Sequence, residues 1–199
     1  MTKVIDYYLF LISPWAYLGG PRLADMARRH GAEVRVKPID ARIVFPATGG
    51  LPLAKRAPER QAYRLAELAR WSRHLDMPLN LQPAHFPAPD ESAARLVIAA
   101  GTTGGDAFGL SQAILAALWT EERDIADPTV LKQIAGENGH DGAALLAKSQ
   151  EEAVGASHRE FSEEAVARGV FGSPSYVYEG DVFWGQDRLD FFDRALAAI

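Results

Sequence analysis

Hydrophobic and polar positions at the start of the chain follow the pattern of strand, helix and strand. Residues 4–12 form a short apolar run, rich in β-branched and aromatic side chains, which favours a buried strand. Ser13-Pro14 then suits the N-cap and first position of a helix, because a serine oxygen can accept an orphan amide and proline has no amide to lose. His30-Gly31 is a stop signal, and residues 33–39 alternate polar and apolar. These residues predict a βαβ unit.

The long middle of the chain carries no convincing strand pattern. A compact domain does not leave residues 40–168 as loop, so this span must be largely helical. In residues 58–75 the apolar positions are helically spaced, and charged residues such as Arg64 and Arg73 are free to face solvent. Similar patterns predict further helices over residues 91–100, 107–122, 128–137 and 142–168, the last broken near Gly155.

The end of the chain returns to a strand pattern. Residues 175–178 and 182–184 are β-rich and are joined by a hairpin signal, and residues 188–198 are helical. The order βαβ, helical insertion, ββα predicts an α/β protein with a thioredoxin-like fold and a four-stranded mixed sheet, although composition alone also permits a looser α/β assignment. Residues 1–39 and 169–199 would form one discontinuous thioredoxin-like domain, and residues 40–168 an all-helical insertion domain.

Composition narrows the functional classes. The chain has 199 residues, a formal net charge of -5 and no cysteine, which excludes disulfides, cysteine-based zinc sites and a thiol nucleophile of its own. The five histidines lack metal-ligand spacing, so we expect no metal site. The acidic balance argues against nucleic acid as a partner, and no apolar stretch approaches the ~18 residues of a membrane span. The first residues lack a signal-peptide pattern, so we expect a cytoplasmic protein.

Ser13 is the first candidate for chemistry. In a thioredoxin-like layout the reactive group lies where the first strand meets the first helix, because the amino end of the helix stabilises an anion there. A serine hydroxyl at that place can donate a hydrogen bond to the thiolate of a bound thiol cofactor. By itself, Ser13 before Pro14 is more often only a helix cap, so both roles stay open.

Two further segments are candidates. Ser173-Pro174 stands at the head of a predicted strand; a cis bond there would leave the amide and carbonyl of Ser173 free to bind an extended ligand, although the trans form is commoner. Asp187 either caps the last helix or presents a carboxylate to an amine, and the cap is the commoner role.

Three motifs together carry a resemblance to a known family. They are SPWAYL at 13–18, GSP at 172–174 and FWGQDRL at 183–189, in that order around a helical insertion. This combination resembles the 2-hydroxychromene-2-carboxylate isomerases, within the wider group of DsbA-like proteins and kappa-class glutathione transferases. The likeness covers essentially the whole chain. It implies glutathione as the cofactor and a small aromatic carboxylate as the substrate; the oligomeric state stays open, a homodimer included.

The resemblance also implies roles for individual residues. Ser13 would orient the glutathione sulfur, and Ser173 before a cis Pro174 would pair with the cysteinyl backbone. Such enzymes are taken to add the thiolate reversibly to the conjugated substrate, so that ring opening and rotation interconvert the chromene and the trans-benzylidenepyruvate. The γ-glutamyl end would be held by Trp184, Gly185, Gln186 and Asp187, with Asp187 binding the α-ammonium group.

The chain departs from the family pattern on the substrate side. Phe10 replaces the usual acidic residue of the first strand, and residues 44–56 give no clear match to a polar segment with lysine and asparagine. Because the substrate has a carboxylate and an aromatic ring, we expect it to contact Lys55, Arg56, His85 and Phe86. The other interpretation is an exposed loop pair at 55–56 and plain packing residues at 85–86.

These features predict a glutathione-dependent cis-trans isomerase of the chromene-carboxylate type, acting in the degradation of aromatic compounds. One alternative is a kappa-like glutathione transferase, which would consume glutathione. The other is a non-catalytic module that binds thiols or peptides without turnover.

Overall fold

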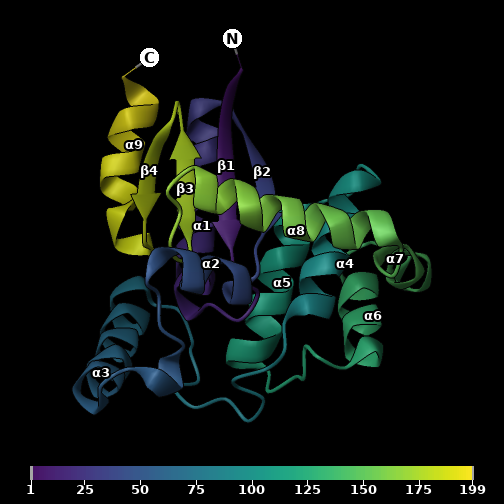
Figure 1. Ribbon diagram of the computed structural model, residues 1–199, viewed down its shortest axis with the longest axis horizontal. Helices are drawn as coiled ribbons and strands as arrows, with labels where there is room; N and C mark the ends of the chain where they lie inside the picture. Colours follow the sequence, from purple (N-terminus) through teal and green to yellow (C-terminus); the bar gives the residue numbers. More distant parts are fainter. Residues whose placement is uncertain (1, 199) are drawn as a thin grey trace.

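The computed structural model describes residues 2–198 and has one mixed sheet with the strand order β2-β1-β3-β4. β1 (Lys3–Leu9) pairs in parallel with β2 (Ala32–Pro38) and antiparallel with β3 (Ser175–Tyr178). β3 pairs antiparallel with β4 (Asp181–Trp184). The predicted βαβ and ββα units are therefore confirmed, and together they build the single thioredoxin-like sheet seen in Figure 1.

α1 (Pro14–His30) connects β1 to β2 and has well-defined ends. Ser13 is its N-cap, Pro14 its first residue, and Gly31 closes it in the left-handed conformation with a φ of 61°. No acidic residue lies in the first turn, whereas Arg28, Arg29 and His30 occupy the last. The basic last turn complements the negative carboxyl end of the helix dipole, and the positive amino end is left without a compensating carboxylate.

All the described elements between β2 and β3 are helical, as predicted. In Figure 1, β1 points toward the end of the molecule where α2 and α3 lie. The pattern did not predict α2, which is capped by Asp40 and contains Pro46. The helical elements after β2 are α2 (Ala41–Thr48), the 3-10 turn η1 (Leu53–Lys55), α3 (Pro58–Leu75), α4 (Glu91–Thr102), α5 (Ala107–Thr120), α6 (Pro128–Glu137), α7 (Gly142–Ser149), α8 (Glu152–Ala167) and, after β4, the 3-10 turn η2 (Gln186–Arg188) and α9 (Leu189–Ala197).

The predicted break near Gly155 is misplaced, because α7 ends at Ser149 and Gly155 lies inside α8. Arg95 explains the difference. Its guanidinium donates to the carbonyls of Ser149 (2.7 Å) and Glu151 (3.0 Å), which satisfies backbone groups left open at the break. A Cβ at Gly155 would lie 3.4 Å from that guanidinium, so the glycine lets Arg95 approach the helix.

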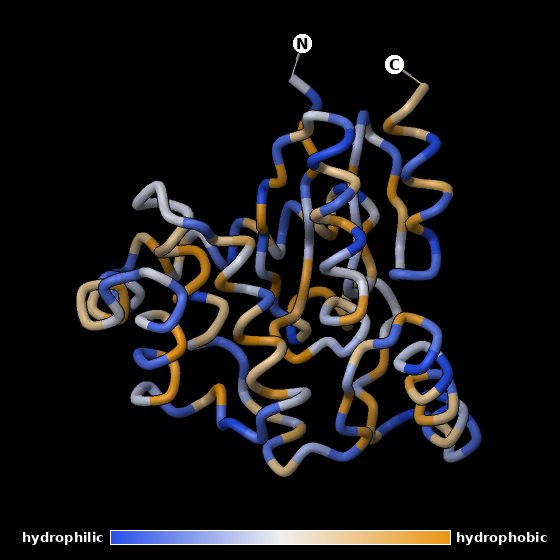
Figure 2. Tube along the Cα trace, turned by 180° about the vertical axis from the view of Figure 1, so that it is seen from behind, coloured by the Kyte–Doolittle hydropathy of each residue, from blue (hydrophilic) through white to orange (hydrophobic). Residues whose placement is uncertain are grey.

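Both faces of the sheet are covered. On one face Tyr7 stacks on Tyr176 (5.5 Å between ring centroids), which stacks on Phe192 of α9. Figure 2 shows hydrophobic positions concentrated along the central strands and the helices packed on them. No helix within residues 2–198 is long and apolar enough to cross a membrane.

A cluster of charges ties α8 to the other face of the sheet. Lys37 of β2 lies 3.1 Å from a carboxylate oxygen of Asp6 in β1 and 2.8 Å from one of Glu164 in α8. Arg168, next after α8, pairs with the second oxygen of Asp6 at 2.6 Å. These side chains are partly withdrawn from water, which is costly for a charged group. Each charge lies beside one of opposite sign, and this pairing offsets part of that cost.

Candidate active site

The site is built around the amino end of α1. Ser13 is buried, with 6% of the residue exposed, and its side-chain oxygen accepts a hydrogen bond from the amide of Ala16 at 3.2 Å. The capping interpretation is therefore confirmed. The same hydroxyl donates to the backbone carbonyl of Ser173 at 3.2 Å, so it also joins the helix to the second predicted segment.

The Ser173-Pro174 segment lies directly against this turn, and its peptide bond is cis. The Ser173 side-chain oxygen accepts a hydrogen bond from the amide of Phe10 at 2.9 Å. The expectation of a free Ser173 carbonyl is wrong, because the buried hydroxyl of Ser13 takes that carbonyl as its acceptor. The two loops are thus linked by reciprocal bonds between side chain and backbone.

The third segment, residues 184–187, is joined to the second. The amide of Gly185 donates to the carbonyl of Pro174 at 2.9 Å, and the Gly185 φ of 95° favours glycine. Trp184 is half exposed and its ring lies 4.8 Å from that of Phe171. This pair forms an aromatic surface beside the linked loops.

Gln186 and Asp187 face different surroundings. Gln186 is buried, and its backbone and side-chain oxygens both accept from the Arg22 guanidinium of α1, at 3.0 and 3.3 Å. Its side chain is therefore engaged inside the protein. Asp187 is exposed and pairs with Arg188 at 2.7 Å, while α9 has no side-chain cap. The capping interpretation of Asp187 is wrong, which leaves its carboxylate at the rim of the site.

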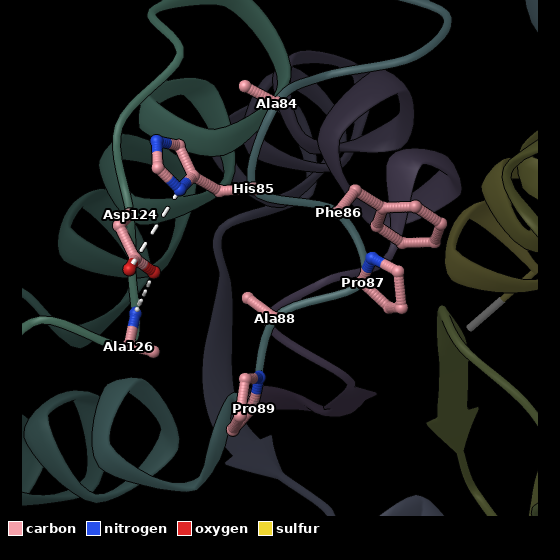
Figure 3. Close-up of a pocket in the computed structure, with 8 residues that line it drawn as sticks. All are labelled: Ala84, His85, Phe86, Pro87, Ala88, Pro89, Asp124 and Ala126. Carbon is pink, nitrogen blue, oxygen red and sulfur yellow. Dashed lines mark hydrogen bonds and ion pairs between the residues drawn. The ribbon is translucent and has the colours of Figure 1, made fainter.

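The four predicted substrate residues do not form one cluster, although Arg56 and Phe86 both lie near Arg64 of α3. Lys55 is exposed at the end of η1, and Arg56 donates from Nε to the Leu51 carbonyl at 2.9 Å. Figure 3 shows the His85 ring directed toward Asp124, at 3.9 Å, and the Phe86 ring directed to the opposite side of the loop. His85, Phe86 and Asp124 all belong to the lining of a surface cavity of about 240 Å³, but the Phe86 ring also packs 4.9 Å from that of Trp119.

Comparison with known proteins adds to this geometry. Residues 4–197 match the family model of the DSBA-like thioredoxin domain. The chain belongs to this family. It is 34% identical to the 2-hydroxychromene-2-carboxylate isomerase of Sphingobium xenophagum, over 98% of this chain and 99% of that one. It is 27% identical to the isomerase of the same name from Pseudomonas putida, over 98% and 95% of the two chains.

Solved structures support the same family fold. A 2-hydroxychromene-2-carboxylate isomerase superposes with a TM-score of 0.82 at 25% identity, over 98% of this chain and 94% of the other. The cytosolic disulfide reductase DsbM of Pseudomonas aeruginosa superposes with a TM-score of 0.71 at 18% identity, over 98% and 100% of the chains. At that identity the second likeness concerns the fold alone.

Asp90 is a polar residue beside this site that the sequence pattern did not single out. Asp90, the residue before α4, accepts a hydrogen bond at Oδ2 from the amide of Leu11 at 3.0 Å, two residues before Ser13. Burial raises the pKa of the Asp90 carboxyl to about 6. An aspartate before an apolar helix looks like an ordinary cap, so no local signal pointed to its partner 79 positions away.

Proposed function

We propose that this protein is a glutathione-dependent isomerase that interconverts 2-hydroxychromene-2-carboxylate and trans-o-hydroxybenzylidenepyruvate. The observation that carries the proposal is the buried Ser13 hydroxyl at the amino end of α1, bonded to the cis-proline loop, in a chain without cysteine. Full-length similarity to the isomerases of S. xenophagum and P. putida supports this reaction over others performed on the same fold.

The residues present fit glutathione. The first turn of α1 has no acidic residue, so the partial positive charge of the helix end remains available to a thiolate. The exposed Asp187 carboxylate suits an ammonium group, as a charge-assisted hydrogen bond requires. Trp184 and Phe171 offer exposed aromatic surface in the two segments joined at Pro174 and Gly185.

Ser13 would orient the sulfur, and Ser173 would pair with the peptide backbone of glutathione. A hydroxyl has one hydrogen to donate, so turning the Ser13 hydroxyl toward a thiolate releases the Ser173 carbonyl to accept from a ligand amide. When bound, glutathione supplies the thiol nucleophile that the chain lacks. The protein contributes preorganised donors at the amino end of α1, which favour the anionic form of the sulfur.

The test is to incubate the protein with glutathione and 2-hydroxychromene-2-carboxylate while following substrate absorbance and free thiol together. The proposal expects isomerisation that depends on glutathione with no loss of free thiol. S-methylglutathione is the control, since it keeps the peptide but has no thiol to donate. Loss of thiol into a conjugate would identify a transferase instead, and binding without turnover would identify a binding module; either result contradicts the proposal.

A further inference from the structure

Arg64 of α3 carries a charge that has no partner within residues 2–198. The sequence pattern placed it toward solvent, but the side chain is half-buried. Its guanidinium carbon lies 5.3 Å from the ring centroid of Phe86 and 5.7 Å from that of Trp119. Other arginines, such as Arg22 and Arg42, pair with carboxylates at 2.7–2.8 Å. A cation withdrawn from water is costly without an anion, and the two aromatic faces offset only part of this cost.

The surroundings of Arg64 add donors rather than acceptors. Burial, followed by the positive charge of Arg56, lowers the pKa of Arg64 to about 10. Arg56 also forms no ion pair with a described carboxylate. Two cations therefore lie near one aromatic cluster, an arrangement suited to an anion with an apolar body.

This cluster is attached to the segment that carries Ser13. Phe86 belongs to the loop between α3 and α4, and that loop is fixed near both ends. The Tyr17 hydroxyl of α1 donates to the Pro78 carbonyl at 3.0 Å, and the Leu11 amide donates to Asp90 at 3.0 Å. Residues on either side of Ser13 thus hold the loop that presents Phe86 to Arg64.

We propose that Arg64, with Arg56 beside it, binds the carboxylate of an aromatic carboxylate substrate whose ring lies against Phe86. The ligand class rests on the proposed function; the residues rest on the unpaired charge and the aromatic cluster. A guanidinium binds a carboxylate through two parallel hydrogen bonds, which a lysine ammonium cannot reproduce. His85 has no part in this site, because its ring lies on the other side of the loop.

The experiment measures calorimetric binding of trans-cinnamate and of its neutral analogue cinnamamide, with glutathione present. The variants are Arg64→Met, Arg64→Lys and, as the matched control, Arg73→Met. Arg73 is exposed on the same helix, and nine residues at 100° each place it on the opposite face from Arg64. Thermal melts establish that each variant is folded.

We expect Arg64→Met to weaken cinnamate binding about 10- to 100-fold and to leave cinnamamide binding unchanged. Arg64→Lys should lose part of the acid affinity, which keeps the test decisive even if the methionine variant fails to fold. Arg73→Met should match wild type. Unchanged acid affinity in the folded Arg64 variants, or an equal loss for acid and amide, would overturn the proposal.

The experiments distinguish failure of the proposed isomerase reaction from failure of the proposed carboxylate site at Arg64. If wild type isomerises the chromene while the Arg64 variants bind cinnamate normally, the reaction stands and the carboxylate site is wrong. If wild type does not isomerise the chromene but cinnamate binding depends on Arg64, the carboxylate site stands and the reaction is wrong.

Discussion

The hydroxyl of Ser13 donates a hydrogen bond to the backbone carbonyl of Ser173, 160 positions further along the chain, at 3.2 Å. The same oxygen caps α1 through the amide of Ala16. One small side chain therefore caps the start of a helix and fixes that helix against the cis-proline loop. Its replacement has separable consequences for stability and for chemistry.

Replacing Ser13 with alanine should lower kcat on the order of 10²–10³, because the bound sulfur loses a preorganised donor. Loss of the cap should also lower the free energy of unfolding by about 1 kcal/mol. Ser13→Gly separates the effects, since glycine is tolerated at an N-cap but lacks the hydroxyl. We expect the glycine variant to be nearly as stable as wild type and as slow as the alanine variant. If folded Ser13→Ala reacts at the wild-type rate, Ser13 acts only as a helix cap and has no role in orienting the sulfur.

Replacing Asp187 with asparagine should weaken glutathione binding by about 1.5–3 kcal/mol, because the ammonium group loses its charged partner. The melting temperature should stay near that of wild type, since Asp187 caps no helix and its pair with Arg188 is exposed. Calorimetric titration with glutathione measures the first effect. Asp181→Asn, at an exposed position that starts β4, is the control and should bind normally. Equal affinities in the two variants would remove Asp187 from the site.

Asp90 should make stability depend on pH in a defined direction. Its pKa of about 6 in the folded protein lies above the value of about 3.9 in an unfolded chain. The folded state therefore holds the proton more tightly, so the contribution of Asp90 is greatest below pH 4 and is lost as the pH rises to about 6. Relative to Asp90→Asn, wild type should lose on the order of 2–3 kcal/mol over this interval.

Urea unfolding of both proteins at pH 4, 5, 6 and 7 measures this difference. The asparagine variant keeps an oxygen that can accept from the Leu11 amide, so it isolates the titration from the hydrogen bond. Parallel stability profiles would mean that the Asp90 carboxyl titrates at its ordinary value in the folded protein.

Gly19→Ala should destabilise the protein by about 1–3 kcal/mol through overpacking. A Cβ at this position of α1 would lie 2.8 Å from the Tyr176 hydroxyl oxygen and 2.9 Å from Cβ of Gln186. Gly136→Ala is the opposite case, because a Cβ there meets nothing within 4 Å in helix α6. It should stabilise by about 0.5–1 kcal/mol. Thermal or urea unfolding decides both, and equal effects would contradict the packing argument.

Local signals explain which parts of the fold were predictable. The bounds of α3 and α6 were predicted to the residue, because each begins at a proline in its first turn and continues with helical spacing. α2 was missed because Pro46 interrupts its pattern, and its Asp40 cap alone does not define a helix. The end of α7 depends on Arg95, which donates from another helix and leaves no mark in the residues around Gly155.

In the candidate site, too, local motifs predicted some residues, and long-range contacts define the others. Ser13 and Ser173 stand in short motifs at the ends of strands and helices, so their placement followed from the fold. Asp90 was missed because it stands where an ordinary helix cap would stand. Arg64 was missed because its position in the helical pattern is typical of a residue that faces solvent. Their surroundings come from Leu11, Phe86 and Trp119, and such contacts become visible only in three dimensions.

The strand order places β1, which precedes the other three strands of this sheet along the chain, in the middle of the sheet. β1 and β2 can pair early, but residues 39–174 must be synthesised before β3 exists to cover the other edge of β1. At the usual speed of translation this interval is on the order of 10 s, and the hydrogen-bonding groups along that edge have no strand partner during it. The nascent chain is therefore most exposed to wrong partners while its insertion is being made, and the last two strands end that risk.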